Sequence, residues 1–331
     1  MQAIVLTQPG GIDQLVVTAV PKPEVKPGWV RIQVKAFGVN ESEVTSRKGE
    51  SDPDFTFPRI LGIEGVGVID AVPAGSALNP GQQVATMMGG MGRSFDGSYA
   101  EYTLVPETQV IPFTSDLPWE TLGALPEMYQ TAHGSLTTGL NLQPDQTLLI
   151  RGGTSTVGLA AASLARLLGA TVISTTRNPD RFELLARNGV LHPIVDTGTI
   201  ADAVRGLAPN GVDAALELVG TSTLGDTIQA VRRGGIACFT GALGGQWSIE
   251  HFSPFGFIPT GVRLTTYGGD ASDLPAGEFA KQLTAIKDGR LAVPIGGIYH
   301  GLAQAGQAQA DLEAGHTPGK HVVVLDSPAD Q

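Results

Sequence analysis

Cysteine is almost absent from this sequence, which has one, Cys238, in 331 residues. A single thiol cannot form an internal disulfide, and it excludes a zinc site built from several cysteines. Cys238 lies in the apolar run 236–239, where we expect an inert, buried thiol. We therefore expect a protein of the reducing cytoplasm.

Long hydrophobic runs and an excess of positive charge are also missing. No apolar run approaches the roughly 18 residues that a membrane-spanning helix needs, and residues 1–6 lack the basic region and the apolar length of a signal peptide. The chain has 21 Lys and Arg against 32 Asp and Glu, a net charge of -11. This balance argues against nucleic acid or an anionic membrane as the main partner, but it is compatible with a local basic pocket for a phosphate.

The length and the order of patterns indicate two domains. Short strand-like runs separated by Pro and Gly turns fill about the first 115 residues, and strands then alternate with helices. Such alternation predicts a parallel, doubly wound sheet. A helix is expected over 223–232, and the last apolar run, 322–325, is expected to return to the first domain's sheet. The predicted organisation is a β-rich domain interrupted by a dinucleotide-binding domain: 1–119, then 120–263, then the returning segment 264–331.

The chain is organised around residues 147–158, which read TLLIRGGTSTVG. A strand-like apolar run is followed by a turn of small residues and then by a helix. This order holds a pyrophosphate, because free N–H groups and the positive end of the helix dipole face the anion. Gly153 and Gly158 fit the first and third glycines of the Rossmann motif, and Ser155 replaces the second. We expect the cofactor beside Gly153, Ser155, Thr156 and Val157.

The residues after the second strand of this domain bear on the choice between NAD and NADP. In NAD-selective folds an acidic residue about 20 positions past the glycine turn binds the ribose 2′-OH. Here that position falls in residues 174–177, where Thr176 and Arg177 offer a hydroxyl and a guanidinium to a 2′-phosphate. We therefore predict NADP(H), with Arg181 as a further phosphate contact. The alternative, that both arginines are solvated charges near a helix start, stays open.

Six phrases of the sequence, in order, resemble the zinc-independent, quinone-oxidoreductase-like branch of the medium-chain dehydrogenase/reductase superfamily. They are AFGVN at 36–40, RKG at 47–49, LGIEGVGV at 61–68, GSYAEY at 97–102, STVG at 155–158 and GKHVV at 319–323. The resemblance covers nearly the whole chain. It implies an α/β protein with a GroES-like β-rich catalytic domain and a Rossmann domain, and it implies homodimers that join Rossmann sheets edge to edge.

The same resemblance implies further cofactor contacts, at Thr131 near the nicotinamide and at the ends of later strands. A doubly wound sheet binds ligands beyond the carboxyl ends of its strands. The implied residues at those ends are Val219, Thr240, Gly241 and Ala242. For Val219, plain core packing is the alternative.

Metal ligands are missing where the zinc-dependent relatives hold theirs. Those relatives place a cysteine where this chain has Val-Asn at 39–40, and a His-Glu pair where it has Ile-Glu at 63–64. Neither an amide nor an isoleucine replaces a thiolate or an imidazole. The histidines are scattered and none has HExxH spacing, so we predict no metal site: His133, His192, His251, His300, His316 and His321.

Without zinc, the cofactor itself carries the hydride step. We therefore predict a reductase of acceptors that need little activation, namely quinones or α,β-unsaturated carbonyls. Asn40 is expected to orient the acceptor, and Tyr267 to hydrogen-bond its oxygen. A backbone-capping Asn40 and a half-buried strand Tyr267 are the alternatives. An enoyl-thioester reductase of the same fold and a non-catalytic NADPH-binding protein also stay open.

Overall fold

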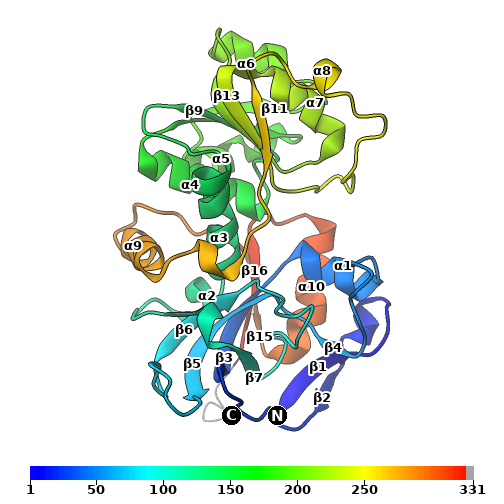
Figure 1. Cartoon of the computed structure of the whole chain (residues 1–331), viewed down its shortest axis with the longest axis vertical. Coiled ribbons are helices and arrows are strands. Elements are labelled where there is room, and N and C mark those ends of the chain that lie inside the picture. Colours follow the sequence, from blue (N-terminus) through cyan, green and yellow to red (C-terminus); the bar gives the residue numbers. More distant parts are fainter. Residues whose placement is uncertain (326–331) are drawn as a thin grey trace. The chain divides into compact units, whose positions relative to one another are not determined.

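The structure, a computed structural model, describes residues 1–325 and divides the chain into two compact units (Figure 1). The first contains Met1–Gln130, Asp270–Lys287 and the chain from Ile295 onward, and we call it the β-rich unit. The second contains Thr131–Gly269 and Asp288–Pro294, and we call it the parallel-sheet unit. The chain therefore leaves the β-rich unit twice, at residues 131 and 288, and returns to it each time.

Two sheets build the β-rich unit. Its strands are β1 (Gln2–Leu6), β2 (Val17–Ala19), β3 (Trp29–Val39), β4 (Arg59–Ile60), β5 (Glu64–Ala71), β6 (Gln83–Met87), β7 (Tyr102–Pro106), β8 (Val110–Pro112), β15 (Ile295–His300) and β16 (Lys320–Val324). The larger sheet has the order β15-β16-β3-β5-β6-β8, with β7 also paired to β3, and the smaller has the order β2-β1-β4. Along β3, buried Val30, Ile32 and Val34 alternate with half-buried polar residues, so one face of the strand meets the core.

The last strand, β16, lies inside the larger sheet. It runs parallel to β15 and antiparallel to β3, with His321 opposite Val39. The predicted return of residues 322–325 to the first sheet is confirmed. The helices of this unit are α1 (Glu41–Lys48), α2 (Trp119–Leu122), the first part of α3 (Pro126–Gly134), α9 (Ala276–Lys287) and α10 (Ala305–Ala314). Of these, α10 packs on β16 and on α1.

The parallel-sheet unit has the strand order β11-β10-β9-β12-β13-β14, with all neighbours parallel. Its strands are β9 (Thr147–Arg151), β10 (Thr171–Thr176), β11 (His192–Val195), β12 (Val212–Glu217), β13 (Val231–Phe239) and β14 (Arg263–Thr266). Its helices are α4 (Thr156–Leu168), α5 (Phe182–Arg187), α6 (Ala201–Leu207), α7 (Thr221–Gln229) and α8 (Pro254–Phe257), and a π-helical turn (Ser135–Gly139) continues α3. This is the strand order of a Rossmann domain.

The chain runs from the central strand β9 to β10 and β11 on one side, then crosses back to β12, β13 and β14 on the other side. Right-handed crossovers therefore place α4 and α5 on one face and α6 and α7 on the other, as Figure 1 shows. Buried small residues of α4, such as Ala161 and Ala165, let that helix pack closely, and α4 ends at Gly169 with a φ of 98°.

One predicted element is wrong in its extent. The helix expected over 223–232 ends at Gln229, and Val231 already belongs to β13. Pairing with β12 overrides helix propensity here, because Val231 lies level with Val212 at the start of that strand. The described chain also has short 3₁₀ helices at Ile12–Gln14, Glu107–Gln109, Pro179–Arg181, Ala271–Asp273 and Leu302–Gln304. Within residues 1–325, every helix is too short or too polar to span a membrane.

Candidate functional site

The carboxyl ends of the parallel strands form one edge of the parallel-sheet unit, which we call the carboxyl edge. Arg151 of β9 is level with Glu217 of β12, and Glu217 is level with Phe239 of β13. The predicted cofactor residues on this edge are Gly153, Ser155, Thr156, Val157, Thr176, Arg177, Val219, Thr240, Gly241 and Ala242. The connection after β9 leads to β10 and the connection after β12 leads the other way, to β13. A doubly wound sheet binds its ligand at the carboxyl edge beside such a reversal of strand order.

The turn after β9 depends on glycine for close approach. Gly152 has a φ of 84°, which favours glycine. A Cβ on Gly153 would lie 1.8 Å from the Oγ of Ser174 in β10. A Cβ on Gly158 would lie 2.6 Å from the carbonyl oxygen of Gly152. The two motif glycines therefore let the turn approach both the neighbouring strand and the helix.

The start of α4 offers hydrogen-bond donors to an anion. Ser155 caps the helix, since its Oγ accepts from the Gly158 amide at 3.1 Å and donates to the Gly152 carbonyl at 2.8 Å. The next two amides, of Thr156 and Val157, have no hydrogen-bond acceptor within the described chain. The dipole of this helix of 13 residues adds to them. Two main-chain donors are therefore available, while the Ser155 hydroxyl is already used.

After β10, too, one predicted contact residue already makes hydrogen bonds within the protein, and another is available to a ligand. The Thr176 hydroxyl donates to the Asn178 carbonyl and accepts from the Asn178 amide, both at 3.2 Å. Arg177 is exposed and makes no ion pair with another residue in the range 1–325. Arg181 is half-buried. A ligand at this edge can therefore reach the Arg177 guanidinium, whereas the Thr176 hydroxyl closes a turn.

A buried carboxylate that the sequence analysis missed, Glu217, shapes the end of β12. It accepts from the amides of Val219 (2.7 Å) and Gly220 (3.1 Å) and from the hydroxyls of Thr223 (3.0 Å) and Thr227 (2.5 Å). Burial raises its pKa, and these hydrogen bonds oppose the rise. Glu217 thus fixes the turn that carries Val219. The signal in the sequence is the acidic residue inside the otherwise apolar run 214–219.

Arg151, the last residue of β9, was also missed. Its guanidinium makes a bidentate pair with Asp196, with both distances 2.9 Å, and donates to Asp226 at 2.7 Å. Its other bonds go to the carbonyls of Gly198 and Thr223 and the hydroxyl of Thr227. Burial alone would raise the pKa of Asp196, but the bonds from Arg151 hold it below its usual range. This network ties β9 to the segment after β11 and to α7.

Two other predicted residues lie in this unit. Thr131, in α3, is half-buried. Tyr267 directly follows β14 and is 7% exposed. Its phenol lies against α3, because a Cβ built on Gly134 would be 1.8 Å from its hydroxyl oxygen.

In the β-rich unit, buried charges surround Asn40. We call Asn40, Glu43, Glu64, Glu127 and Lys320 the Lys320 cluster. The Lys320 ammonium donates to Asn40 Oδ1 (2.5 Å), Glu64 Oε1 (2.8 Å) and Glu127 Oε2 (2.8 Å). Asn40 Nδ2 donates to Glu64 Oε1 at 3.0 Å and lies 3.4 Å from Glu43 Oε1. The other oxygen of Glu64 accepts the Glu127 amide at 2.8 Å.

The fold brings this cluster together from distant parts of the sequence. Asn40 is the N-cap residue of α1 and directly follows β3, while Glu64 begins β5 and Lys320 begins β16. Since β16 runs antiparallel to β3, Lys320 reaches the end of β3 that Asn40 follows. A Cβ on Gly38 would lie 2.3 Å from Glu64 Oε1, so glycine in β3 makes room for the carboxylate.

The charges of the cluster shift one another's pKa. Burial alone would lower the pKa of Lys320, but Glu127 and Glu64 raise it above its usual range. Burial raises the pKa of Glu64, and Lys320 opposes the rise. Burial also raises the pKa of Glu43 to about 7. Lys320 is 1% exposed and Glu64 is fully buried, so this pair is shielded from water.

The residues around Asn40 do not fit a catalytic zinc. An amide and an isoleucine, Asn40 and Ile63, offer neither the thiolate nor the imidazole that a catalytic zinc commonly binds. The Lys320 ammonium already occupies the oxygens of Asn40 and Glu64. In the part of the chain that the structure describes, no group of three or more His, Cys, Asp or Glu is placed to hold a metal ion.

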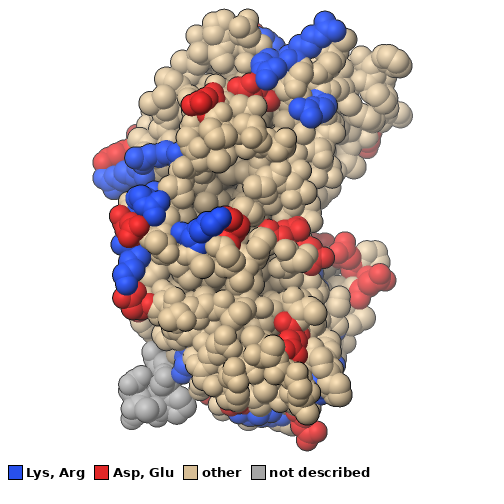
Figure 2. All heavy atoms as spheres, turned by 60° about the vertical axis from the view of Figure 1, so that its left-hand side comes forward, with Lys and Arg blue, Asp and Glu red and all other residues tan. Residues whose placement is uncertain are grey.

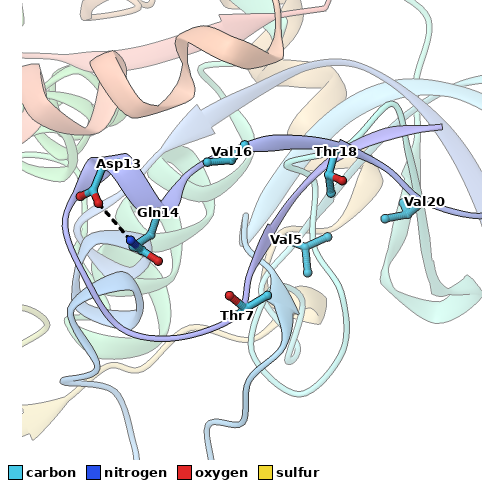
Figure 3. A pocket seen from close by; sticks show the side chains of 7 residues that line it. All are labelled: Val5, Thr7, Asp13, Gln14, Val16, Thr18 and Val20. Atoms are coloured by element: carbon cyan, nitrogen blue, oxygen red, sulfur yellow. Dashed lines mark hydrogen bonds between the residues drawn. The ribbon is translucent and has the colours of Figure 1, made fainter.

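One surface hollow lies away from the predicted site residues. An open hollow of about 490 Å³ lies on the β-rich unit, beside β1 and β2 (Figure 3). In it, Gln14 donates to Asp13 at 3.0 Å, and none of the predicted site residues lines it: its lining is Val5, Thr7, Asp13, Gln14, Val16, Thr18 and Val20. On the face shown in Figure 2, basic side chains lie singly or in small groups, several of them beside acidic ones.

Two known families match the chain, in two separate ranges of the sequence. The family described as "Alcohol dehydrogenase GroES-like domain" matches residues 26–115, and the one described as "Zinc-binding dehydrogenase" matches residues 156–281. The chain belongs to the medium-chain dehydrogenase/reductase superfamily. It is a quinone-oxidoreductase-like member, and the predicted combination of a GroES-like domain with a Rossmann domain is confirmed.

Curated relatives match parts of this superfamily member. A "Synaptic vesicle membrane protein VAT-1 homolog" of Rattus norvegicus is 31% identical over 67% of this chain and 54% of its own length. The chain thus spans about half the length of the VAT-1 relatives that it matches. A "Quinone oxidoreductase" of Pongo abelii is 27% identical over 68% of each chain.

Solved structures match nearly the full length of the superfamily member. A structure titled "NAD-dependent alcohol dehydrogenase" has a TM-score of 0.87 at 26% identity, covering 98% of this chain and 100% of its own. A mycobacterial protein complexed with NADPH has a TM-score of 0.84 at 27% identity, covering 98% of this chain and 99% of its own. One of these two similar structures is thus named for NAD, and the other was solved with NADPH.

Proposed function

We propose that this protein is a zinc-free, NADPH-dependent oxidoreductase that transfers hydride to a quinone or an α,β-unsaturated carbonyl. The observation that carries the proposal is the ammonium of Lys320 bonded to Asn40 and Glu64. In zinc-dependent relatives those two positions hold a metal ligand and the neighbour of a second one. Here a lysine supplies the positive charge, and the donor available to a substrate is an amide.

The carboxyl edge supports binding of a dinucleotide. The amides of Thr156 and Val157 would hold the pyrophosphate, and Gly153 would permit its close approach. The remaining contacts would come from Thr131, Val219, Thr240, Gly241 and Ala242. A bound dihydronicotinamide supplies the hydride.

The choice of NADPH over NADH rests on Arg177. Residues 174–177 carry no carboxylate, so nothing there repels a 2′-phosphate or favours a free ribose hydroxyl. Arg177 is exposed and without an ion-pair partner among residues 1–325, so its guanidinium is free to bind the phosphate. Arg181 is the second cation of this stretch and would add to the local positive charge.

The acceptor must be one that needs little activation, because a single neutral hydrogen bond replaces a Lewis acid. An Asn40 N–H donated to a carbonyl oxygen would orient the acceptor and stabilise the negative charge that develops on that oxygen. Quinones and conjugated enones meet this requirement, since their electron systems spread the charge. Tyr267 is buried against α3, so we assign the final proton to water.

The experiment is a steady-state assay of NADPH oxidation with a panel of quinones, enones and one enoyl thioester. Binding of NADPH and NADH is measured in parallel by intrinsic fluorescence and by the thermal midpoint. We expect NADPH to bind and to be oxidised by a quinone or an enone. Turnover limited to the enoyl thioester would move the function to that substrate class. Tight binding without turnover would indicate a non-catalytic NADPH-binding protein, and unchanged fluorescence and midpoint would contradict the proposal.

A further inference from the structure

The hydrogen-bonding chemistry of the Lys320 cluster fixes the orientation of the Asn40 amide. An ammonium can only donate, so the group of Asn40 that faces Lys320 must be the carbonyl oxygen. An ionised carboxylate can only accept, so the group that faces Glu64 must be the NH₂. The distances agree with this assignment: 2.5 Å from Lys320 Nζ to Oδ1 and 3.0 Å from Nδ2 to Glu64.

One N–H of the Asn40 amide remains loosely held. The NH₂ group has two N–H donors, and one of them binds Glu64. The other has Glu43 Oε1 at 3.4 Å, beyond the usual range for such a bond. That oxygen already accepts the Ile63 amide at 2.9 Å. Asn40 is half-buried and Glu43 is 1% exposed, so this weakly bonded N–H is the one that Asn40 could share with a ligand.

Lys320 is the charged donor on the carbonyl side of the amide, at 2.5 Å from Oδ1, and the main-chain N–H of Glu43 faces the same side in the capping box of α1. The stem of Lys320 reaches the cluster past Gly38, where a Cβ would lie 3.0 Å from Lys320 Cδ. Its two other bonds, to Glu64 and Glu127, hold the ammonium in place with both carboxylates at 2.8 Å. Without the ammonium, the carbonyl side of the amide would lose its charged donor, and the amide would be held less firmly.

We propose that Lys320 is the positioning residue of the acceptor site: by binding Asn40 Oδ1 it holds one Asn40 N–H toward the carbonyl oxygen of the acceptor. This inference rests on the proposed function and deepens it. It assigns Lys320 no contact with substrate or cofactor. Its effect on turnover therefore passes entirely through Asn40.

The test is a double-mutant cycle with Lys320→Met and Asn40→Ala. We expect each single variant to lower kcat about a hundred-fold, the usual cost of removing one such donor, with the NADPH Kd unchanged. We expect the double variant to lose no more than the worse single variant, because both changes remove the same N–H. Two results would overturn the assignment: a Lys320→Met kcat within a factor of about two of the wild type, or a double loss equal to the product of the single losses.

Two control variants distinguish the loss of positioning from a loss of folding. Lys320→Met leaves two carboxylates without their cation, so Lys320→Met/Glu127→Gln is made beside it to remove one negative charge while keeping Glu64. The same loss of kcat is expected in this variant, and full recovery of kcat would count against positioning. Lys287→Met, at a lysine that is 61% exposed in an ion pair with Asp116, should leave kcat unchanged.

A readout independent of turnover separates this inference from the proposed function. In protein labelled with ¹⁵N at asparagine, the side-chain NH₂ signal of Asn40 is identified by its loss in Asn40→Ala. We expect a rigid NH₂ group in the wild type and a mobile one in Lys320→Met. An equally rigid group in both would overturn the positioning role even if the protein turns over. Absence of turnover in the wild type with a mobile group in the variant would count against the function alone.

Discussion

Lys320 in the β-rich unit and Arg151 in the parallel-sheet unit are both buried among carboxylates, but the two differ in the groups that they leave available for binding. All five N–H groups of Arg151 are directed to acceptors inside the parallel-sheet unit. Lys320 also binds two carboxylates, yet its third bond holds Asn40, a half-buried amide with one loosely held N–H. A saturated buried cation fixes the fold around it, whereas a buried cation that binds a partly exposed side chain prepares that side chain to bind.

A third cation, Arg177, completes the comparison. It lies on the same carboxyl edge as Arg151, but it is exposed and without an ion-pair partner in the described part of the chain. The burial and the partners of the three cations therefore indicate three different roles. Arg151 stabilises the fold, Lys320 positions Asn40, and Arg177 is available to bind a ligand. The predictions below test this separation.

The largest effect is expected from Arg151→Met. It leaves Asp196 and Asp226 without their common partner, and breaking such a buried pair costs about 3–5 kcal/mol. Urea denaturation should show this loss in the free energy of unfolding. The matched control is Arg187→Met, whose ion pair with Glu183 is exposed, and it should change little. A loss below about 1 kcal/mol for Arg151→Met would contradict the structural role.

The next effect comes from Glu43, which has no cation of its own. Its pKa is about 7 in the folded protein against an ordinary value of 4.5, so its contribution to stability is fully present below pH 4.5 and lost as pH rises through 7. The shift corresponds to about 3 kcal/mol. A glutamine at this position cannot titrate. The free energy of unfolding of Glu43→Gln, measured across this pH range, should therefore increase relative to that of the wild type as pH rises. A difference that is independent of pH would contradict the buried, titrating carboxylate.

Arg177→Glu tests the exposed cation. We expect NADPH binding to weaken about ten- to a hundred-fold, or about 1.4–2.7 kcal/mol, while NADH binding changes far less. Isothermal titration with both dinucleotides measures this. Arg187→Glu, another exposed arginine of the same unit, is the control for net charge. Equal losses for NADPH and NADH would mean that Arg177 does not bind the 2′-phosphate.

The smallest effect is expected where a lysine and its partner are both exposed. Lys287 and Asp116 form an ion pair at 2.7 Å with exposures of 61% and 71%. Lys287→Met should change the free energy of unfolding by less than about 0.5 kcal/mol. A loss approaching that of Arg151→Met would show that burial does not determine how much each of these cations contributes to the free energy of unfolding.

The sequence predicted the scaffold better than the charge clusters. The glycine turn and the apolar strands are local patterns, so the Rossmann domain and the return of the last strand could be predicted from the residues themselves. The helix over 223–232 extended too far because pairing of Val231 with Val212 is invisible to local periodicity. The short helix α1 was missed, although its N-cap residue, Asn40, had been singled out.

The cations were missed for a related reason. Lys320 and Glu64 are 256 positions apart in the chain, and Arg151 and Asp226 are 75 apart. In the sequence, Lys320 lies within one of the phrases that carry the family resemblance, and Arg151 is a charged residue at the end of an apolar run. Neither position indicates which side chains these two cations contact. Only the antiparallel pairing of β16 with β3 brings Lys320 to Asn40. Roles that depend on such pairings need the tertiary structure, whereas Arg177 could be proposed from its position after a strand.

The central claim, hydride transfer without zinc, is tested most directly with NADPH deuterated at C4 and an enone acceptor. The protein is first treated with a strong chelator, and its zinc content is measured. We expect deuterium at the β-carbon of the product and a rate that added zinc does not raise. Product formed only after zinc is restored, or no transfer of the label, would contradict the account.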